Sequence, residues 1–324
     1  MRWVTYTTAA GDDRVGLVSG GGGVGGSIEA DGTAEVRAIE PGVTLLDLLD
    51  AGPDGLPAAA ERATTAPSEV VPLAGAALRA PLQPRSIRDS TGFLQHLRNC
   101  RGQVDLGFDE RNYQFPAFYF SNVAAVVGPH DEVAISPGSE RFDYELEVCA
   151  VIGTPGSTIA LDRAEEHIAG YMLLCDWSAR DLQMNEMALR LGPAKGKDGA
   201  NTLGPMLVTP DEIASRRSGV SFDLAMTGYV NGELVSEGNW KTIDWAFADM
   251  ITYMSRGTHL RPGDVIGSGT VPTGCLFEHF AMNPDTFRGW LQPGDEVRLV
   301  VEGLGELRQR VVACVKPEPL SSGY

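Results

Sequence analysis

The acidic residues at positions 143–147 (DYELE) are the first group whose types and spacing could do chemistry. In a β-strand, Glu145 and Glu147 would share one face and Tyr144 and Leu146 the other. The apolar string CAVI that soon follows is typical of a buried strand. Two neighbouring carboxylates there would repel each other and lose hydration unless a cation compensated them. The pattern therefore predicts a divalent-cation site, with an edge strand that has one wet face as the alternative.

Two further segments carry polar groups of the same kind. In GYMLLCDWSARD, an apolar run ends at Asp176 just before a polar stretch, a position where sites are commonly built. In SIRDSTGFLQHLRN, His96 follows Asp89 by seven residues, which is two helical turns and roughly the same helix face. Taken alone, His96 is more typical of a surface histidine or a hydrogen-bonded core histidine than of a catalytic one.

Short strands and turns must position these groups. The N-terminal strings RWVTYTTA, RVGLVSG and AEVRAIE predict strands, and residues 43–49 predict a helix. Residues 51–70, rich in Ala, Pro, Gly and Thr, indicate a connecting stretch around one short helix. We place a domain boundary near residue 75. It separates a small N-terminal domain and linker (1–75) from a larger domain (76–324).

The larger part is also mostly strands between turn signals. Asn231-Gly232 in TGYVNGELVSE predicts a two-residue hairpin turn. Helical patterns are fewer and cover residues 91–100, 161–168 and 243–256. Because strands and helices do not alternate regularly, the pattern predicts an α+β fold dominated by β rather than a doubly wound sheet.

The charge balance excludes several classes of partner. With 26 Lys+Arg against 43 Asp+Glu, the net charge of −17 argues against binding to nucleic acid or to anionic membranes. No apolar run approaches the ~18 residues of a membrane-spanning helix. The N-terminus lacks the basic-then-apolar order of a signal peptide. We therefore expect a soluble cytoplasmic protein with no nucleic-acid or membrane partner.

Two other features suggest chemistry that the sequence does not support. Residues 21–26 match G-x-G-x-x-G, but the turn-like SIEADG follows where a dinucleotide site needs a helix, so we interpret a hairpin loop. The five cysteines are an odd number, widely spaced and without C-x-x-C, which argues against disulfides or zinc. Cys149 and Cys175 lie in apolar runs typical of core positions.

Four sequence motifs of this chain resemble those of a known enzyme family. RDSTGFLQH, DYELE, DWSARDLQ and GCLFE, in this order, resemble the catalytic domain of the fumarylacetoacetate hydrolase family over about residues 80–318. The resemblance implies a β-rich catalytic domain, a β-sandwich roll, preceded by a small β-rich N-terminal domain. It also implies a homodimer and a hydrolase that cleaves a carbon–carbon bond in a β-diketone or acylpyruvate-type keto acid.

The resemblance also implies a set of metal ligands and a catalytic pair. The ligands would be Asp89, Glu145, Glu147 and Asp176. An all-oxygen set favours a hard cation, so we expect Mg²⁺, with Ca²⁺ or Mn²⁺ as alternatives. His96 would activate water with Glu278 as the orienting carboxylate.

A lysine is implied beside Arg180 and Gln183 to stabilise the oxyanion that develops during the reaction. Lys197 matches that lysine by the pattern GP-x-x-G-K and by its spacing to Pro205. Lys195 remains the alternative, because other members of the family read A-K-G-x-D.

Substrate contacts are implied at four positions. Tyr119 and Thr270 match residues that contact substrate in the family. Thr91 and Met187 stand where fumarylacetoacetases have tyrosines, so two phenol hydrogen-bond donors are missing from the expected pocket. Fumarylacetoacetate itself is therefore in doubt, and the expected substrate is a small keto acid of the same type.

Two alternatives remain open. The same metal site could serve a decarboxylase or an isomerase of a related keto-diacid. The domain could also be a non-catalytic metal- or ligand-binding protein. Retention of both His96 and Glu278 favours hydrolysis over either alternative.

Overall fold

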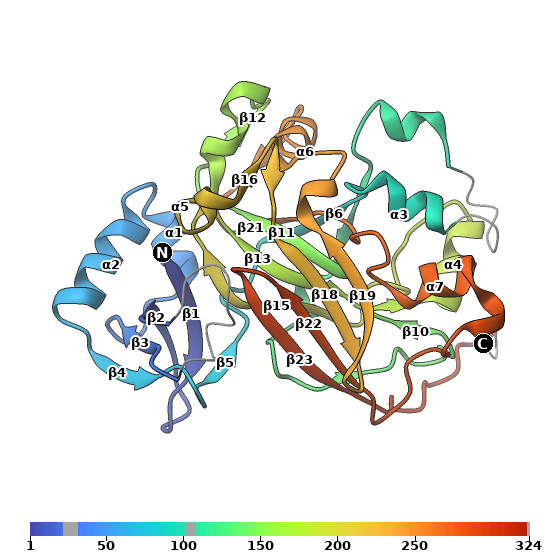
Figure 1. The fold of residues 1–324 in the computed structure, drawn as a ribbon, viewed down its shortest axis with the longest axis horizontal. Helices are drawn as coiled ribbons and strands as arrows, with labels where there is room; N and C mark the ends of the chain where they lie inside the picture. The colour runs from blue at the N-terminus through green and yellow to red at the C-terminus, as the bar shows by residue number, and fades with distance from the viewer. Residues whose placement is uncertain (22–31, 101–107, 323–324) are drawn as a thin grey trace.

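The computed structural model describes residues 1–21, 32–100 and 108–322 and shows an α+β fold dominated by strands (Figure 1). The predicted fold class is therefore confirmed. The Gly-rich segment at 21–26 lies almost wholly outside the described residues, so its interpretation as a hairpin loop stays a prediction. Within the described part of the chain, no helix is both long and apolar enough to cross a membrane.

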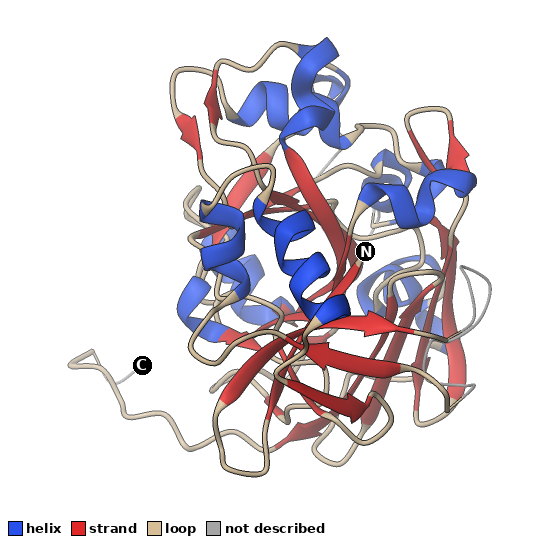
Figure 2. Cartoon of the chain, turned by 90° about the vertical axis from the view of Figure 1, so that its left-hand side faces the viewer, coloured by secondary structure: helices blue, strands red, loops and turns tan. Residues whose placement is uncertain are grey.

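The N-terminal strands predicted from the sequence are present. The elements of this part are β1 (Arg2–Thr7), β2 (Asp13–Ser19), β3 (Glu35–Ala38), α1 (Leu45–Asp50), α2 (Gly55–Thr65), β4 (Glu69–Pro72) and β5 (Ala77–Arg79). Leu45 and Leu56 of the two helices pack with Trp3 and Val15 of the strands in one buried core. Figure 2, which views the molecule from this side, shows these helices across the strands behind them.

A single sheet joins the N-terminal strands to the rest of the molecule. The described residues form a 12-stranded sheet in the order β4-β3-β2-β1-β15-β13-β11-β21-β6-β7. The two remaining strands are β5, which pairs with β1, and β8, which pairs with β15. Its other strands are β15 (Asn201–Val208), β13 (Ile168–Asp176), β11 (Leu146–Ile152), β21 (Asp264–Gly267), β6 (Ser86–Ser90), β7 (Phe118–Ser121) and β8 (Val126–Val127). β1 pairs with β15 through Arg2 and Val208. The boundary near residue 75 stays a prediction.

β11 is an inner strand, paired to β13 on one side and β21 on the other. All seven of its residues are buried. The alternative of an edge strand with a wet face is therefore wrong.

A second sheet packs across the first. Its order is β19 (Glu233–Asn239), β18 (Ala225–Val230), β22 (Glu296–Val301), β23 (Gly305–Val312) and β9 (Val133–Ala134). In Figure 1 these strands lie across β13 and β15. Val148 of the first sheet and Leu299 of the second share one core, as in a β-sandwich. The predicted hairpin turn at Asn231-Gly232 is confirmed, with φ of 54° and 81° at the two residues.

The helix predicted over 91–100 begins later, as α3 (Leu94–Asn99). The Gly92 N–H donates to the Ser268 carbonyl at 2.8 Å, which ties residue 92 to the sheet. The Asp244 carboxylate accepts from the N–H of Leu94 at 2.7 Å and so satisfies the first turn. The start of α3 is thus fixed by contacts with distant segments.

The other helix predictions also change in extent. The pattern over 243–256 gives α6 (Phe247–Met254), and the pattern over 161–168 gives a 3₁₀ helix, η3 (Leu161–His167). Two more helices matter for the site: α4 (Arg180–Ala188) and α7 (Leu276–Met282). The remaining short elements are η1 (Glu110–Tyr113), η2 (Val123–Ala125), β10 (Phe142–Asp143), β12 (Gly156–Ser157), β14 (Ser178–Ala179), α5 (Pro210–Ile213), η4 (Ala214–Arg216), β16 (Arg217–Ser218), β17 (Ser221–Phe222), η5 (Trp240–Thr242), β20 (His259–Leu260) and η6 (Pro284–Thr286).

Candidate active site

Four buried carboxylates meet where the inner strands of the large sheet lie side by side. Asp89 comes from β6, Glu147 from β11, Asp176 from the end of β13, and Glu145 from the residue before β11. One oxygen from each lies within 4.8 Å of the others. The structure therefore brings together all the residues predicted as ligands.

The strand pairing explains how this cluster forms. Asp89 lies beside Gly267 in the parallel pair of β6 and β21. A Cβ atom at Gly267 would come within 2.2 Å of Asp89 Oδ1, so only glycine leaves room for this carboxylate. On the other face, the Tyr144 hydroxyl lies 2.7 Å from Ser236 Oγ. The predicted alternation, with glutamates on one face and Tyr144 and Leu146 on the other, is confirmed.

The electrostatics of the cluster suit a divalent cation. Burial raises the pKa of Glu147 well above its usual value, and the charges of Asp89 and Glu145 raise it further. Burial also raises the pKa of Asp176 to about 8, although Lys197 opposes the shift. Among the described residues, Glu147 Oε1 and Asp176 Oδ1 are buried and accept no hydrogen bond. Buried acceptors without partners are rare in folded proteins, and an oxygen-binding cation would satisfy these two.

One lysine enters the cluster. Lys197 Nζ lies 2.5 Å from Glu145 Oε2 and 2.6 Å from Asp176 Oδ2, with 4% of its side chain exposed. Lys195, the alternative, is 72% exposed and pairs with Asp198. The structure thus places Lys197, and not Lys195, against the carboxylates.

Arg180 is the second cation beside the cluster. Its Nη2 lies 2.7 Å from Glu145 Oε1 and 2.7 Å from Asp143 Oδ2, and its Nη1 donates to Gln183 Oε1 at 3.2 Å. Burial alone would raise the pKa of Glu145, but Arg180 and Lys197 outweigh it and lower that pKa. Arg180 is the first residue of α4.

Asp143 connects two parts of the site and was missed by the sequence analysis. It accepts from Arg180 Nε at 2.9 Å and from the backbone N–H groups of Leu276 and Phe277 at 2.8 and 3.0 Å. Those N–H groups open α7, which carries Glu278. Asp143 begins the DYELE string, yet its partners lie 37 to 134 positions away, so no local pattern reveals them.

His96 and Glu278 form the predicted pair. His96 Nδ1 lies 2.8 Å from Glu278 Oε1, and Glu278 is fully buried. The other oxygen, Oε2, accepts from Asn99 Nδ2 at 2.6 Å and from the Thr273 N–H at 2.9 Å. Burial alone would lower the pKa of His96, but the charges of Cys100 and Glu278 outweigh it and raise that pKa well above its usual value.

The helical argument that linked Asp89 to His96 is wrong. Asp89 lies in β6, and the chain turns at residues 91–93 before α3 begins. The two side chains nevertheless line one cavity, because residue 92 is tied back to the sheet.

Asp89, Glu145, Glu147 and His96 open into one cavity of about 220 Å³. Its lining includes the four residues expected to contact substrate: Thr91, Tyr119, Met187 and Thr270. The Tyr119 hydroxyl donates to Asp176 Oδ2. Arg180, Gln183, Met184 and Met187 line the same cavity at spacings of three, four and seven, so one face of α4 forms a wall.

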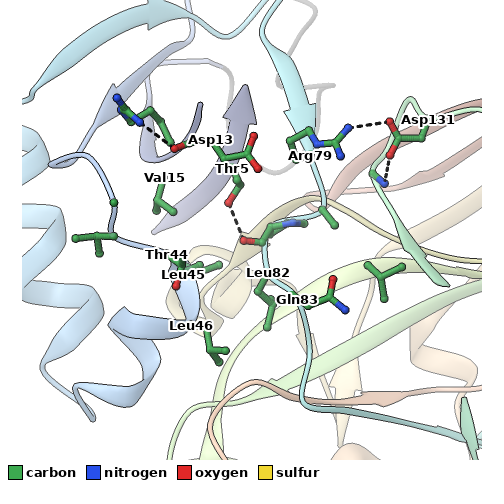
Figure 3. Close-up of a pocket in the computed structure, with 17 residues that line it drawn as sticks. Thr5, Asp13, Val15, Thr44, Leu45, Leu46, Arg79, Leu82, Gln83 and Asp131 are labelled. Carbon is green, nitrogen blue, oxygen red and sulfur yellow. Dashed lines mark hydrogen bonds and ion pairs between the residues drawn. The ribbon is translucent and has the colours of Figure 1, made fainter. Parts of the chain in front are cut away.

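A second cavity, of about 370 Å³, lies between the N-terminal strands and the segment around residue 80 (Figure 3). Its polar groups are bonded to neighbours. Thr5 Oγ1 donates to the Pro81 carbonyl at 2.7 Å, and Arg79 Nη1 lies 3.2 Å from Asp131 Oδ1. This larger cavity contains neither the carboxylate cluster nor the histidine, and its residues were not among those predicted to be functional.

Comparison with known proteins identifies the family. The sequence model described as "Fumarylacetoacetate (FAA) hydrolase C-terminal" matches residues 85–312. The chain belongs to the fumarylacetoacetate hydrolase family. Among curated members, "Oxaloacetate tautomerase FAHD2A, mitochondrial" of Homo sapiens is 32% identical over 92% of this chain and 87% of its own. The "2,4-didehydro-3-deoxy-L-rhamnonate hydrolase" of a Sphingomonas species is 34% identical over 60% of this chain and 65% of its own.

Solved structures of the fumarylacetoacetate hydrolase family share the fold. The fumarylacetoacetate hydrolase from Exiguobacterium antarcticum aligns with a TM-score of 0.71 at 25% identity, over 97% of this chain and 100% of its own. The fumarylpyruvate hydrolase from Pseudomonas aeruginosa, solved with Mn²⁺ and pyruvate, aligns with a TM-score of 0.58 at 27% identity. That alignment covers 77% of this chain and 94% of the other.

Proposed function

We propose that this chain is a metal-dependent hydrolase that cleaves a carbon–carbon bond in an acylpyruvate or related β-diketo acid. The observation that carries the proposal is the hydrogen bond between His96 and the buried Glu278, in a cavity that also exposes three of the four clustered carboxylates. Family membership supports a reaction of this type.

The residues that would hold the cation are Asp89, Glu145, Glu147 and Asp176. Their donor set is all oxygen, and two of the oxygens lack any hydrogen bond in the described structure, so the cluster fits a hard divalent ion. We propose Mg²⁺, with Mn²⁺ and Ca²⁺ as alternatives. A cation bound there would polarise a carbonyl group and stabilise negative charge on oxygen.

His96 would act as the base. With Nδ1 bonded to Glu278, the neutral form of His96 can take a proton from water at Nε2, and the carboxylate stabilises the imidazolium that forms. The water oxygen then bonds to the keto carbon of the acyl group. The bond from that carbon to the neighbouring methylene breaks, and its electron pair stays on the pyruvate fragment as an enolate. His96 returns its proton to the methylene carbon.

Lys197, Arg180 and Gln183 would stabilise the negative charge that develops on oxygen. Lys197 and Arg180 are held in place by Glu145, and Arg180 in turn orients the side-chain amide of Gln183. Because these groups are buried and already oriented, little reorganisation is needed during the reaction.

The pocket supports a small substrate. Thr91 and Met187, which replace two tyrosines expected for fumarylacetoacetase, line the cavity together with Phe93, Leu97 and Phe277. We therefore propose an acylpyruvate with a short acyl group, which needs no phenol donor at its far end.

Keto–enol isomerisation of a keto-diacid is the second candidate. The relatives named as oxaloacetate tautomerases match 92% of this chain, whereas the named rhamnonate-pathway hydrolase matches 60%. The same groups would serve: His96 would remove a proton from the carbon beside the ketone and deliver it to oxygen. Decarboxylation of such a substrate is the remaining alternative.

One assay separates these reactions. Acetylpyruvate and oxaloacetate would be incubated with the protein and Mg²⁺, or with a chelator, while enol absorbance is followed and products are analysed by mass spectrometry. We expect acetylpyruvate to gain one water and give acetate and pyruvate only when metal is present. A change in oxaloacetate enol absorbance without a mass change would favour the tautomerase, and loss of CO₂ a decarboxylase.

Two further expectations remain proposals. We propose a homodimer, as the resemblance to the family implies, and a cytoplasmic location. Size-exclusion chromatography with light scattering would test the first, and imaging of the tagged protein in its host would test the second.

A further inference from the structure

A thiol completes a three-residue chain with the histidine and glutamate. Cys100 directly follows α3, one turn after His96, and lines the same cavity. Its Sγ lies 3.9 Å from His96 Nε2, while His96 Nδ1 lies 2.8 Å from Glu278 Oε1. This order of thiol, imidazole and buried carboxylate is the arrangement that activates a nucleophile. The hydrolysis proposed above makes no use of the thiol.

The orientation of His96 decides what the thiol can do. Glu278 faces Nδ1, which in the neutral imidazole assigns the proton to that nitrogen and leaves the lone pair at Nε2 facing Cys100. The thiol proton therefore has an acceptor within reach. Because the thiolate is the reactive form of cysteine, this contact favours reaction at Cys100.

Among the described residues, no other cysteine both contacts His96 Nε2 and lines the cavity: Cys275 Sγ lies 3.9 Å from Glu278 Oε1 but is not part of the cavity lining. Cys149, Cys175 and Cys275 are buried, and burial raises the pKa of each thiol. Cys314 is half-buried like Cys100, but in the described residues it makes no hydrogen bond to an imidazole. Cys314 is thus a matched internal control for Cys100.

We propose that Cys100 is a covalent modification site for carbonyl-conjugated alkenes that enter the cavity. His96 Nε2 takes the thiol proton, and the sulfur bonds to the β carbon of the alkene. The π electrons move onto the carbonyl as an enolate, and His96 returns the proton to the α carbon. The product is a thioether, and no oxidant or other reactant is consumed.

The cavity selects the kind of alkene. Leu97 and Phe277 line it with apolar surface, whereas Arg180 and Lys197, together with the cation proposed for the carboxylate cluster, would supply positive charge for a ligand carboxylate. We therefore assign the ligand class as unsaturated keto acids. The carboxylate in this assignment rests on the proposed function, but the reactivity of the thiol does not.

The adduct would stop turnover. Water and the thiol share His96 Nε2, so a thioether at Cys100 would fill the cavity beside the base. An unsaturated keto acid would thus inactivate the enzyme in a time-dependent way, and whatever turnover Cys100→Ser retains would resist it.

The test uses 4-oxopent-2-enoate, a carboxylate-bearing enone, on the full chain, with peptide mapping by mass spectrometry. We expect Cys100 to gain the mass of the probe at least about tenfold faster than Cys314, and His96→Gln to remove that advantage, because the thiolate fraction sets the rate. The neutral probe N-ethylmaleimide should show the same dependence on His96 with less preference for Cys100. An unchanged rate at Cys314 in His96→Gln would show that the variant is folded.

Equal labelling of Cys100 and Cys314 in the unmodified protein would overturn the proposal, as would labelling of Cys100 that is unaffected in His96→Gln. The readout is mass and requires neither metal nor turnover. A protein that fails to hydrolyse acylpyruvates can therefore still pass this test, and a hydrolase can fail it.

Discussion

The two cavities differ in how their charged groups are satisfied. In the larger one, beside the N-terminal strands, Arg79 and Asp131 neutralise each other and Thr5 is bonded to backbone. At the smaller one, Glu147 in the lining and Asp176 behind it are buried, and each has an oxygen that accepts no hydrogen bond in the described structure. Unsatisfied buried acceptors of this kind mark a functional site more reliably than volume does.

The difference also has an energetic side. Half-exposed ion pairs such as Arg79–Asp131 contribute about 0–1 kcal/mol, so the larger cavity neither gains nor loses much from its charges. The carboxylate cluster carries mutual repulsion and desolvation that Lys197 and Arg180 offset only in part, since Arg180 also pairs with Asp143. The fold therefore tolerates an unfavourable group of charges at one place, as expected where a ligand provides the compensation.

The largest effect is expected when one carboxylate of the cluster is removed, because the smaller cavity would then lose its proposed metal site. We expect Glu147→Ala to weaken Mg²⁺ binding by more than about a hundredfold, since even residues that only orient a metal ligand contribute ten- to a hundredfold. Activity should disappear with the metal. Isothermal titration with Mg²⁺ and the acylpyruvate assay would measure both. Glu296→Ala, an exposed glutamate in the second sheet, is the control. Full Mg²⁺ affinity in Glu147→Ala would refute the ligand assignment.

Removing the base should separate chemistry from metal binding. We expect His96→Ala to lower kcat by about a hundred- to ten-thousandfold, the usual contribution of a general base. Its Mg²⁺ affinity should stay near normal, because His96 is not part of the carboxylate cluster. His259→Ala, at an exposed position in β20, serves as the control. Substantial hydrolysis by His96→Ala would show that another group activates the water.

Asp143→Asn should have an intermediate effect. The variant keeps the shape of the side chain but weakens the bonds to Arg180 and to the start of α7. Because Arg180 would stay buried with one carboxylate partner fewer, we expect a loss of up to about 3 kcal/mol in unfolding free energy. We also expect kcat to fall about tenfold with little change in KM, since only the oriented charge is disturbed.

The matched variant is Glu302→Gln, which weakens the pair between Glu302, the residue after β22, and Arg216 of η4. It should lower the thermal midpoint by a smaller amount and leave kcat unchanged. Equal loss of kcat in both variants would mean that Asp143 acts only through stability.

Local patterns predicted the parts of the site that depend on one strand or turn. Alternation in DYELE separated Glu145 and Glu147 from Tyr144, and the apolar run before Asp176 marked a strand end. These predictions succeeded because side-chain direction in a strand is set by the local backbone.

The remaining features depend on contacts between distant segments. The partners of Asp143, the late start of α3 and the larger cavity all arise from tertiary packing, which no string of neighbouring residues encodes. Cys100 is the partial exception. Its spacing of four from His96 on a predicted helix could have suggested the contact, but only the pairing with Glu278 shows which nitrogen faces the thiol.

The pH dependence of stability should differ with and without metal. Burial first, and then neighbouring charge, raises the pKa of Glu147. Burial also raises the pKa of Asp89 above its ordinary value, and it raises the pKa of Asp176 to about 8. A raised carboxyl pKa in the folded state stabilises below the ordinary value and loses that contribution as pH rises through the folded value. Without metal, stability should therefore fall between about pH 5 and pH 8.

Thermal unfolding with Mg²⁺ or with a chelator would test this. The increase in midpoint caused by Mg²⁺ should grow as pH rises, because the ion binds the deprotonated carboxylates. The same series in Glu147→Ala should show a much smaller increase. An increase that shrinks with rising pH would contradict the assignment of these groups.

The smallest effect is expected at the larger cavity. Arg79→Ala removes the ion pair with Asp131, whose other oxygen would still accept from the Gly128 N–H. Because both partners are partly exposed, the unfolding free energy should change by less than about 1 kcal/mol. Acylpyruvate turnover, KM and Mg²⁺ affinity should all be unchanged, as the cavity shares no lining residue with the carboxylate site.

A marked change in kcat in this variant would mean that the N-terminal strands, which join the central sheet through β1 and β15, transmit strain to the site. The contrast between an inert cavity and a reactive one would then no longer hold.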